Sequence, residues 1–252
     1  MRQYVLPKYF KGDSEFKLNK EDSQYFIKVL RLKKKDKIFS RDQNGVPYQL
    51  TIMSYDKNSC LCKVEKINEG DTFETTDTLP EINEERPKLN LFQCVCKGKK
   101  NESIIRMATE FGVESITLIQ SKFCIAKKET SNNQRYEKII KEAIQQSGSP
   151  VITKFNDVIN FKDFIKNLDM PLFFFHQISL EENLTLKEKV NSIDPKKPIG
   201  ILIGPEGGLS DEECSLLLEK KAVPVTLKTN ILRAETASIV ALSTIHTLLV
   251  EK

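Results

Sequence analysis

Three glycines and a proline surround one glutamate in the segment Gly204–Ser210, which reads GPEGGLS. The segment directly follows Ile199–Ile203, an apolar run that we predict to be a buried strand. Glycine has no side chain, so the backbone of such a loop can approach a ligand closely. The segment matches neither the Walker pattern, which needs Gly-Lys-Ser/Thr, nor the dinucleotide pattern Gly-x-Gly-x-x-Gly. An ordinary connecting loop is the alternative, although it does not explain the carboxylate of Glu206 between the glycines.

A second segment with charged side chains, Leu227–Ala237, joins the end of an apolar run to the start of a helix. Arg233 and Glu235 flank this start, and the helix is predicted to run to about Val250. The amides and the dipole at the beginning of a helix favour negative charge nearby. The alternative is structural, because a first-turn glutamate also stabilises its own helix and a neighbouring arginine can be its partner.

Both segments depend on strands and helices that alternate from Leu89 onwards. The predicted strands are Leu89–Cys96, Ser115–Ile119, Val151–Phe155, Leu172–Phe175, Ile199–Ile203 and Val223–Leu227. Helices are predicted from an N-cap at Asn101 to Gly112, from Arg135 to Ser147, and from Ser210, where Glu213 completes a capping box. The last helix is expected to bury Val240, Ala241, Thr244, Ile245 and Leu248. This alternation is typical of a mostly parallel sheet covered by helices on both faces, whose ligands bind at the carboxyl ends of the strands.

The first 75 residues have a different pattern, with short alternating strands at 37–41, 47–52 and 60–64. The dipeptide Asn44-Gly45 indicates a hairpin turn between the first two, and one helical piece covers Asp22–Leu30. We therefore predict a small β-barrel at 1–75. Residues 76–88 are polar, acidic and contain two prolines, which predicts a linker, and 89–252 form the second domain.

The positive charge of the chain is unevenly distributed. The net charge is +4, and residues 1–75 contain 15 Lys and Arg against 11 Asp and Glu. Basic clusters at Arg31–Lys37 and Lys97–Lys100 suit a phosphate backbone. A solvated surface is the alternative interpretation, and charge alone does not decide between the two.

Cysteines and apolar runs exclude several other classes of protein. The pairs Cys60/Cys62 and Cys94/Cys96 are spaced more tightly than zinc ligands, and the chain has only two histidines, so we expect buried free thiols and no metal. The apolar runs are far shorter than the roughly 20 residues of a membrane-spanning helix. The first residues lack a leader pattern. We expect a cytoplasmic protein with no membrane association.

Taken together, the segments Ile203–Ser210 and Ile231–Ala237 closely resemble motifs of the ribosomal RNA small subunit methyltransferase E family, which belongs to the SPOUT class of α/β-knot methyltransferases. The resemblance covers nearly the whole chain. Further family-like segments follow in the family's order: Val29–Leu32, Lys97–Lys99, Glu110–Val113, Glu142-Ala143 with Gln146–Gly148, and His176.

The resemblance implies an α/β fold with two parts, an N-terminal PUA-like RNA-binding barrel and a C-terminal sheet that forms a trefoil knot. Knots are rare exceptions to the usual rules of topology, so the sequence pattern alone would not predict one. The resemblance also implies S-adenosylmethionine as cofactor and a homodimer. The implied reaction is methylation of N3 of one uridine in 16S ribosomal RNA of the small ribosomal subunit.

Site residues follow from the same resemblance. The residues placed nearest the chemistry are Arg233, Glu235 and Glu206. Those expected to bind S-adenosylmethionine are Phe175, His176, Leu202, Ile203, Gly204, Pro205, Gly207, Leu227, Ile231, Leu232, Thr236 and Ala237. Those expected to hold the RNA backbone around a base that has left its stack are Arg31, Lys33, Lys34, Lys35, Lys97, Lys99 and Lys100.

The chain departs from the family pattern at a few positions. Lys228 and Asn230 stand where the family usually has Gly and Arg, Ser149 where it usually has Arg, and Tyr25 where many members have His. A lysine is a point cation rather than a planar fork, so Lys228 replaces a lost guanidinium only in charge. Two alternatives stay open: a SPOUT enzyme that methylates a ribose 2′-OH or a tRNA base, and a non-catalytic RNA-binding factor of ribosome assembly.

Overall fold

The computed structural model describes residues 3–68, 86–125, 133–177 and 185–251. They form two compact units. Unit 1 holds the described residues of Met1–Glu81 together with Ile144–Ile152, and unit 2 holds those of Ile82–Ala143 and Thr153–Lys252. Residues 144–152 thus group with the N-terminal part of the chain. Most of the predicted linker, 76–85, lies outside the described residues.

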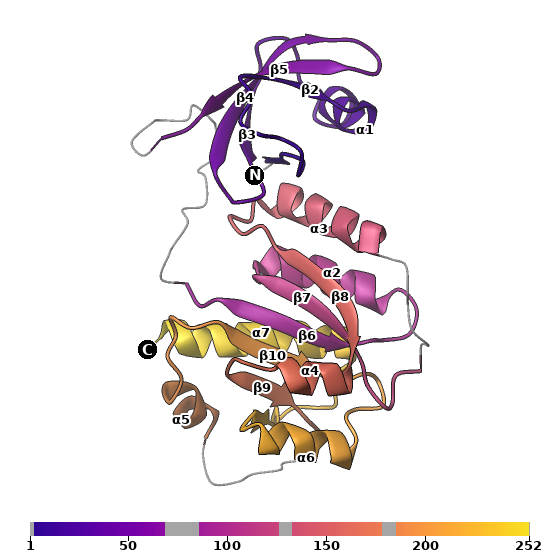
Figure 1. Ribbon diagram of the computed structural model, residues 1–252, viewed down its shortest axis with the longest axis vertical. Helices are drawn as coiled ribbons and strands as arrows, with labels where there is room; N and C mark the ends of the chain where they lie inside the picture. The colour runs from indigo at the N-terminus through magenta and orange to yellow at the C-terminus, as the bar shows by residue number, and fades with distance from the viewer. Residues whose placement is uncertain (1–2, 69–85, 126–132, 178–184, 252) are drawn as a thin grey trace. The chain divides into compact units, whose positions relative to one another are not determined.

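Unit 1 contains a mixed five-stranded sheet in the order β1-β3-β4-β5-β2 (Figure 1). Its strands are β1 (Tyr4–Val5), β2 (Glu15–Leu18), β3 (Lys37–Arg41), β4 (Pro47–Tyr55) and β5 (Cys60–Lys66). β1 runs parallel to β3, and the other neighbours are antiparallel. The three predicted strands are therefore confirmed as β3, β4 and β5. β1 is only two residues long, and β2, whose residues alternate between exposed and buried, was missed by the prediction.

The hairpin turn between β3 and β4 follows from its sequence. Gly45 adopts φ +81°, which glycine tolerates without strain. The Asp42 carboxylate accepts hydrogen bonds from the backbone N–H groups of Asn44 and Val46 at 2.8 and 2.9 Å. The helical piece predicted at 22–30 is present as α1 (Lys20–Gln24), continued by the π-helical turn η1 (Tyr25–Val29). The Tyr4 hydroxyl donates to the buried Asp22 carboxylate at 2.7 Å and ties β1 to α1.

Unit 2 contains six parallel strands in the order β11-β9-β10-β6-β7-β8. They are β6 (Leu89–Cys94), β7 (Ser115–Gln120), β8 (Lys154–Asn160), β9 (Leu172–Phe175), β10 (Ile199–Ile203) and β11 (Val223–Val225). β9 and β10 have the predicted bounds, because uninterrupted apolar runs suit strands that are buried on both faces. β8 begins three residues after the predicted start at Val151 and continues to Asn160, so both predicted ends of this strand were wrong.

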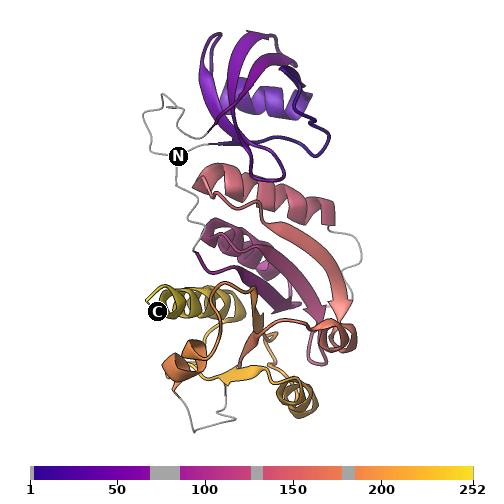
Figure 2. The same ribbon diagram turned by 60° about the vertical axis from the view of Figure 1, so that its left-hand side comes forward.

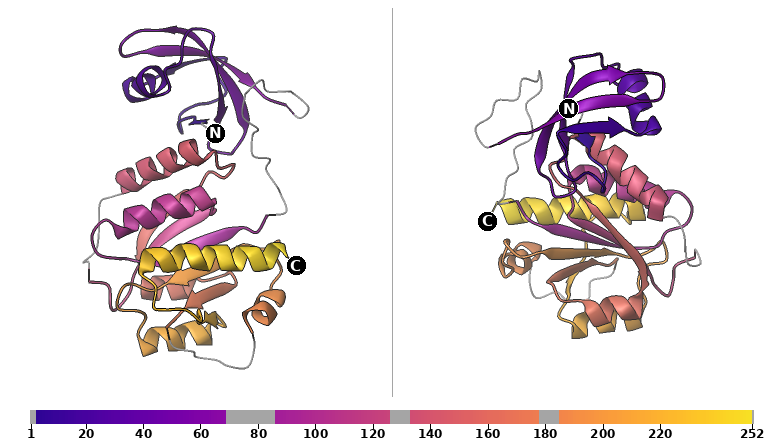
Figure 3. Two further views of the ribbon diagram at one scale, coloured as in Figure 1. Left: turned by 180° about the vertical axis from the view of Figure 1, so that it is seen from behind. Right: turned by 45° about the horizontal axis from the view of Figure 1, so that its top comes forward.

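Helices cover both faces of this sheet. α2 (Lys100–Phe111) and α7 (Ala234–Val250) lie on one side, and α4 (Phe161–Asn167) and α6 (Asp211–Glu219) lie on the other (Figure 2). Seen from behind, α7 crosses the sheet next to α2 (Figure 3). The remaining helices are α3 (Asn133–Ser147) and α5 (Leu186–Asn191). No helix among the described residues is both long and apolar enough to cross a membrane.

Two predictions about helices were wrong. Asn101 is not an N-cap, because α2 begins one residue earlier, and its buried side chain instead bonds both the N–H and the carbonyl of Cys96. In α7 the prediction was right for Ala241 and Ile245, which are fully buried together with Leu242, and wrong for Val240, which is only half-buried. Thr244 and Leu248 are half-buried as well. α7 is apolar on most of its surface, so its sequence gives no narrow stripe from which to choose the buried face.

Candidate functional site

The carboxyl ends of β6, β9, β10 and β11 meet where the strand order reverses. From β6 the sheet continues outward through β7 and β8, whereas β10, β9 and β11 lie on its other side. Such a switch point is the usual place for a ligand in an open parallel sheet. A cavity of about 710 Å³ lies there. Its lining comes from β9, from the loops after β10 and β11, and from the starts of α2, α6 and α7.

The loop after β10 folds back on itself. The Gly208 N–H donates to Pro205 O at 2.9 Å, and Gly208 has φ +74°. A Cβ atom on Gly204 would lie 3.3 Å from the Gly208 backbone, so this position has little room for a side chain. The loop ends at Ser210, which forms the predicted capping box with Glu213 at the start of α6. The backbone of Gly204–Gly208 therefore forms one wall of the cavity.

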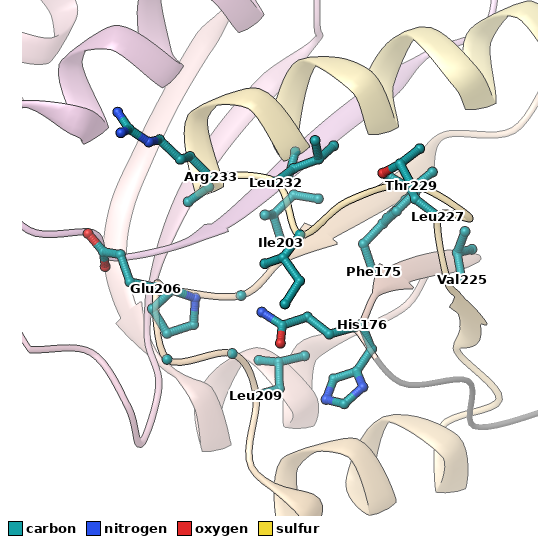
Figure 4. A pocket seen from close by; sticks show the side chains of 18 of the residues that line it. Phe175, His176, Ile203, Glu206, Leu209, Val225, Leu227, Thr229, Leu232 and Arg233 are labelled. Carbon is teal, nitrogen blue, oxygen red and sulfur yellow. The ribbon is translucent and has the colours of Figure 1, made fainter.

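The loop after β11 forms the opposite wall. The His176 N–H donates to Val225 O at 2.9 Å and fixes the end of β9 beside β11. The Thr229 N–H donates to Leu227 O at 2.8 Å as the chain turns towards α7. In Figure 4, side chains from this loop and from the ends of β9, β10 and β11 lie at one end of the pocket. That end is apolar and contains Phe175, Ile203, Val225, Leu227 and Leu232.

The other end of the pocket carries charge. Arg233 and Glu206 lie on this side of the pocket (Figure 4), and the Arg233 side chain is exposed. Glu206 Oε1 accepts from Lys100 Nζ at 2.7 Å and from the Lys97 N–H at 3.1 Å. Burial alone would raise the pKa of Glu206, but these hydrogen bonds lower it below its ordinary value. The same contact raises the pKa of Lys100. Glu206 is therefore held as a carboxylate.

Two carboxylate oxygens are buried without a hydrogen-bond partner among the described residues: Glu206 Oε2, at this end of the pocket, and Glu235 Oε2, which does not line it. A buried acceptor without a donor costs about 1–3 kcal/mol, which a ligand that donates a hydrogen bond would recover. Burial, and then the nearby negative charge of Glu206, raises the pKa of the Cys96 thiol to about 12. Cys96 is therefore a neutral thiol rather than a nucleophile.

Most of the residues predicted from the resemblance to bind the cofactor do line the cavity. They are Phe175, His176, Ile203, Gly204, Pro205, Gly207, Leu227, Ile231, Leu232 and Ala237, and they are joined by Glu206, Arg233 and Lys100. Leu202 does not line it, because alternation along β10 turns its side chain into the core beneath α4 and α6. Thr236 is exposed and Glu235 is half-buried, and neither lines the cavity. Whether each lining residue binds a cofactor stays a prediction.

Several lining residues were missing from that prediction: Gln177, Gly208, Leu209, Asp211, Val225, Thr229, Asn230 and Ala234. Gly208 and Leu209 lie inside a loop that the sequence already indicated, and Thr229 and Asn230 lie inside the second segment. These four residues could have been predicted by including every residue of the two loops. Val225 and Gln177 depend on the pairing of β9 with β11, which no local pattern predicts.

The basic residues predicted to contact RNA are mostly exposed. In unit 1, Arg31 and Lys33–Lys35 lie in a tight turn in which Arg31 and Lys35 adopt positive φ angles of 57° and 75°. The Asp36 carboxylate holds this turn by accepting from the Lys33 N–H at 2.7 Å. In unit 2, Lys97 and Lys99 are exposed and Lys100 is paired with Glu206.

All six cysteines are free thiols. Cys60 and Cys62 project from the same face of β5, with their sulfur atoms 3.8 Å apart. Within the described part of the chain, no group of three or more His, Cys, Asp or Glu side chains could hold a metal ion.

Comparison with known proteins relates this geometry to one family. Residues 83–246 match the model of the RNA methyltransferase domain family. The chain is 31% identical to ribosomal RNA small subunit methyltransferase E 2 of Borreliella burgdorferi, over 89% of this chain and 88% of that protein. It is 30% identical to ribosomal RNA small subunit methyltransferase E of Bacillus subtilis, over 91% and 89% of the two chains.

A solved structure shares the fold. The ribosomal RNA small subunit methyltransferase E of Neisseria gonorrhoeae, bound to S-adenosyl methionine, superposes with a TM-score of 0.79 over 98% of each chain at 22% identity. This likeness confirms the α/β architecture, with its mixed sheet and its parallel sheet.

Proposed function

This chain belongs to the ribosomal RNA small subunit methyltransferase E family, and from that membership we propose that it methylates N3 of one uridine in 16S ribosomal RNA with S-adenosylmethionine as methyl donor. The observation that carries the proposal is the pocket between the loops after β10 and β11. These are the two segments in which the family motifs lie, and together they enclose a cavity of about 710 Å³.

The residues of the pocket fit the proposed donor. Phe175, Ile203 and Leu227 form an apolar end that suits an adenine ring (Figure 4). The backbone of the two loops offers N–H and carbonyl groups for the ribose and the amino-acid part. The negative charge of Glu206, together with its unpaired Oε2, suits a cation that also donates hydrogen bonds. S-adenosylmethionine, when bound, supplies a methyl group on a positively charged sulfur.

The charged end of the pocket would act on the nucleobase. The proton on uridine N3 must leave, and negative charge then develops on O2 and O4 of the ring. We assign stabilisation of this charge to Arg233, whose guanidinium donates in a planar fork. Glu206 and Glu235 are the carboxylates that could accept the proton. The lowered pKa of Glu206 makes it a weak base, so we favour a hydrogen-bonding role for Glu206. Glu235 does not line the cavity, so we assign the proton to neither carboxylate.

The rest of the chain would bring the RNA to this pocket. We propose that unit 1 is the PUA-like RNA-binding domain of the family and that its basic turn at Arg31–Lys35 contacts phosphates. We also propose that the loops of unit 2 form the trefoil knot of the SPOUT class. Because its substrate would be ribosomal RNA, we place the protein in the cytoplasm.

A homodimer is the proposed assembly. Ile231, before α7, and Val250, at its end, are apolar side chains that are 78% and 61% exposed. Large exposed apolar side chains are typical of a subunit interface. Light scattering on the purified protein tests this proposal, and a monomer at micromolar concentration would contradict it.

The reaction is tested by incubating the protein with labelled S-adenosylmethionine and small ribosomal subunits that lack the modification. Mass mapping of nucleosides should find N3-methyluridine at one position of 16S ribosomal RNA. A methylated ribose or a methylated transfer RNA would show a different target. Asn230 lines the pocket where the family usually has arginine, so a non-catalytic factor is the second candidate. Absence of S-adenosylmethionine binding by calorimetry would favour it.

A further inference from the structure

A polar side chain is buried in the middle of the sheet, next to the pocket. Gln93 lies on β6, opposite Ile203 of β10, and its side chain is completely buried. A glutamine in such a position must satisfy its amide with protein partners, because an unpaired amide in an apolar core is costly. An apolar residue of the same size would fill this position without that requirement. The polar group is therefore informative about function.

The partners of Gln93 belong to both walls of the pocket. Its Oε1 accepts from the hydroxyl of Ser238 in α7 at 2.6 Å. Its Nε2 donates to Cys94 O at 3.0 Å and makes a longer contact of 3.4 Å with Gly204 O, in the loop after β10. The orientation of the amide is determined by these neighbours, because a flipped amide would point its oxygen at two carbonyl oxygens.

Ser238 extends the contact to the start of α7. Its hydroxyl oxygen also lies 2.7 Å from Ala234 O, one turn earlier. A hydroxyl has a single proton, so Ser238 donates either to Gln93 Oε1 or to Ala234 O, and both acceptors lie within hydrogen-bond distance. Ala234 and Gly204 both line the cavity. The amide of Gln93 thus connects the backbone of one wall to the first turn of the helix that carries the other.

We propose that Gln93 is a positioning residue that, through Ser238, holds the two cofactor loops at the spacing required to bind S-adenosylmethionine. The inference rests on the proposed function, since it names what fixes that same site. Gln93 does not line the cavity itself, so it acts on affinity by preorganisation. Removing the connection should weaken cofactor binding and leave the reacting groups in place.

The test compares Gln93→Met, Ser238→Ala and the double variant with wild type, by calorimetry with S-adenosylmethionine and by steady-state kinetics. Ser115→Ala is the matched control, because the Ser115 hydroxyl donates to the side chain of Asn90 at the opposite end of β6, at 2.7 Å. Each single variant at the connection should raise the Kd for S-adenosylmethionine by about three- to tenfold. KM should rise by the same factor, with kcat at saturating cofactor changed less than about twofold. The double variant should bind S-adenosylmethionine with the same Kd as Gln93→Met, because both changes remove the same contact.

Several results would overturn the inference. They are an unchanged Kd in Ser238→Ala, an equal loss in Ser115→Ala, or losses at Gln93 and Ser238 that multiply in the double variant. If Gln93→Met does not fold, Ser238→Ala against Ser115→Ala decides alone. A wild-type protein that does not bind S-adenosylmethionine would instead refute the proposed function, and the inference with it. If the wild type and the variants all bind S-adenosylmethionine tightly, the inference is wrong while the proposed function stands.

Discussion

The ammonium group of Lys100 lies 2.7 Å from Oε1 of Glu206, although the two residues are 106 positions apart in the chain. The contact joins the first residue of α2 to the loop after β10, and the Lys97 N–H reinforces it. It leaves the second carboxylate oxygen of Glu206 buried without a partner among the described residues. This arrangement distinguishes an oriented carboxylate from a glutamate on an ordinary loop.

Replacing this carboxylate should affect ligand binding more than folding. Glu206→Gln keeps the shape of the side chain and removes its charge, so we expect methyl transfer to fall by about ten- to a hundredfold, the range for a lost charged hydrogen bond. The measurement is kcat/KM for S-adenosylmethionine, with thermal unfolding recorded in parallel. Lys122→Met is a suitable control, because Lys122 pairs with Glu212 in an exposed contact at 3.0 Å and should change neither quantity appreciably.

Replacing Gly200, in β10, and Gly204, in the loop after β10, by alanine should have different effects. At Gly200 a Cβ atom would approach Leu172 to 2.7 Å and Phe92 to 2.9 Å, inside the core. Gly200→Ala should therefore lower the free energy of unfolding by about 1–3 kcal/mol. Gly204→Ala should instead distort the loop that folds on Gly208 and weaken S-adenosylmethionine binding. Denaturant titration and calorimetry of both variants check this, and a variant pair with the reverse behaviour would contradict it.

The stability of unit 2 should depend on the protonation of His246. Burial, and then the charge of Arg86, lowers the pKa of this imidazole below 6.5 in the folded protein. The unfolded chain therefore binds the proton more readily, so the free energy of unfolding falls as the pH decreases from about 6.5 towards the lowered value. His246→Gln cannot titrate and should lose less stability over this interval. Denaturant unfolding at pH 7.5 and pH 5.5 measures the difference, and parallel losses in both proteins would refute the prediction.

The basic turn of unit 1 should contribute to RNA affinity through charge alone. Lys33, Lys34 and Lys35 are exposed in a turn held by Asp36. Replacing all three by glutamine should weaken binding of 16S ribosomal RNA and reduce the slope of log K against log salt. Binding titrations at several salt concentrations test this. A similar loss on replacing Lys57, Lys63 and Lys66 would show that the charge of the unit, rather than this turn, is responsible.

The parts of the fold that could be predicted are those whose sequence patterns lie within a few adjacent residues. β9, β10 and the loop Gly204–Ser210 follow from apolar runs, glycines and a capping box that are adjacent in sequence. Motif resemblance, rather than periodicity, indicated the second loop and the cofactor. The errors have physical reasons: Asn101 found a backbone partner in Cys96, and α7 is apolar on too many sides to show which one is buried.

The rest of the site depends on contacts between distant segments. Nothing near Gln93 in the sequence indicates that its amide meets Ser238, 145 residues later. The same holds for Lys100 with Glu206, and for residues 144–152, which group with unit 1 through hydrogen bonds such as Gln3 Nε2 to Ser149 O at 2.7 Å. These contacts between distant residues can be predicted only when the order of the strands in the sheet is known, because the strand order and register decide which segments are neighbours.

The position of β10 in the sheet has a consequence for synthesis of the protein. β10 pairs with β6 and with β9, so it occupies the middle of a sheet whose other half, β6 to β8, leaves the ribosome long before it. Until β10 emerges, one long edge of β6 has no partner, and pairings between distant segments of this kind form slowly. The cofactor pocket can assemble only after residue 237 has been translated. A nascent chain stalled before β10 should therefore be sensitive to protease and to chaperone binding, whereas unit 1 could fold its own sheet beforehand.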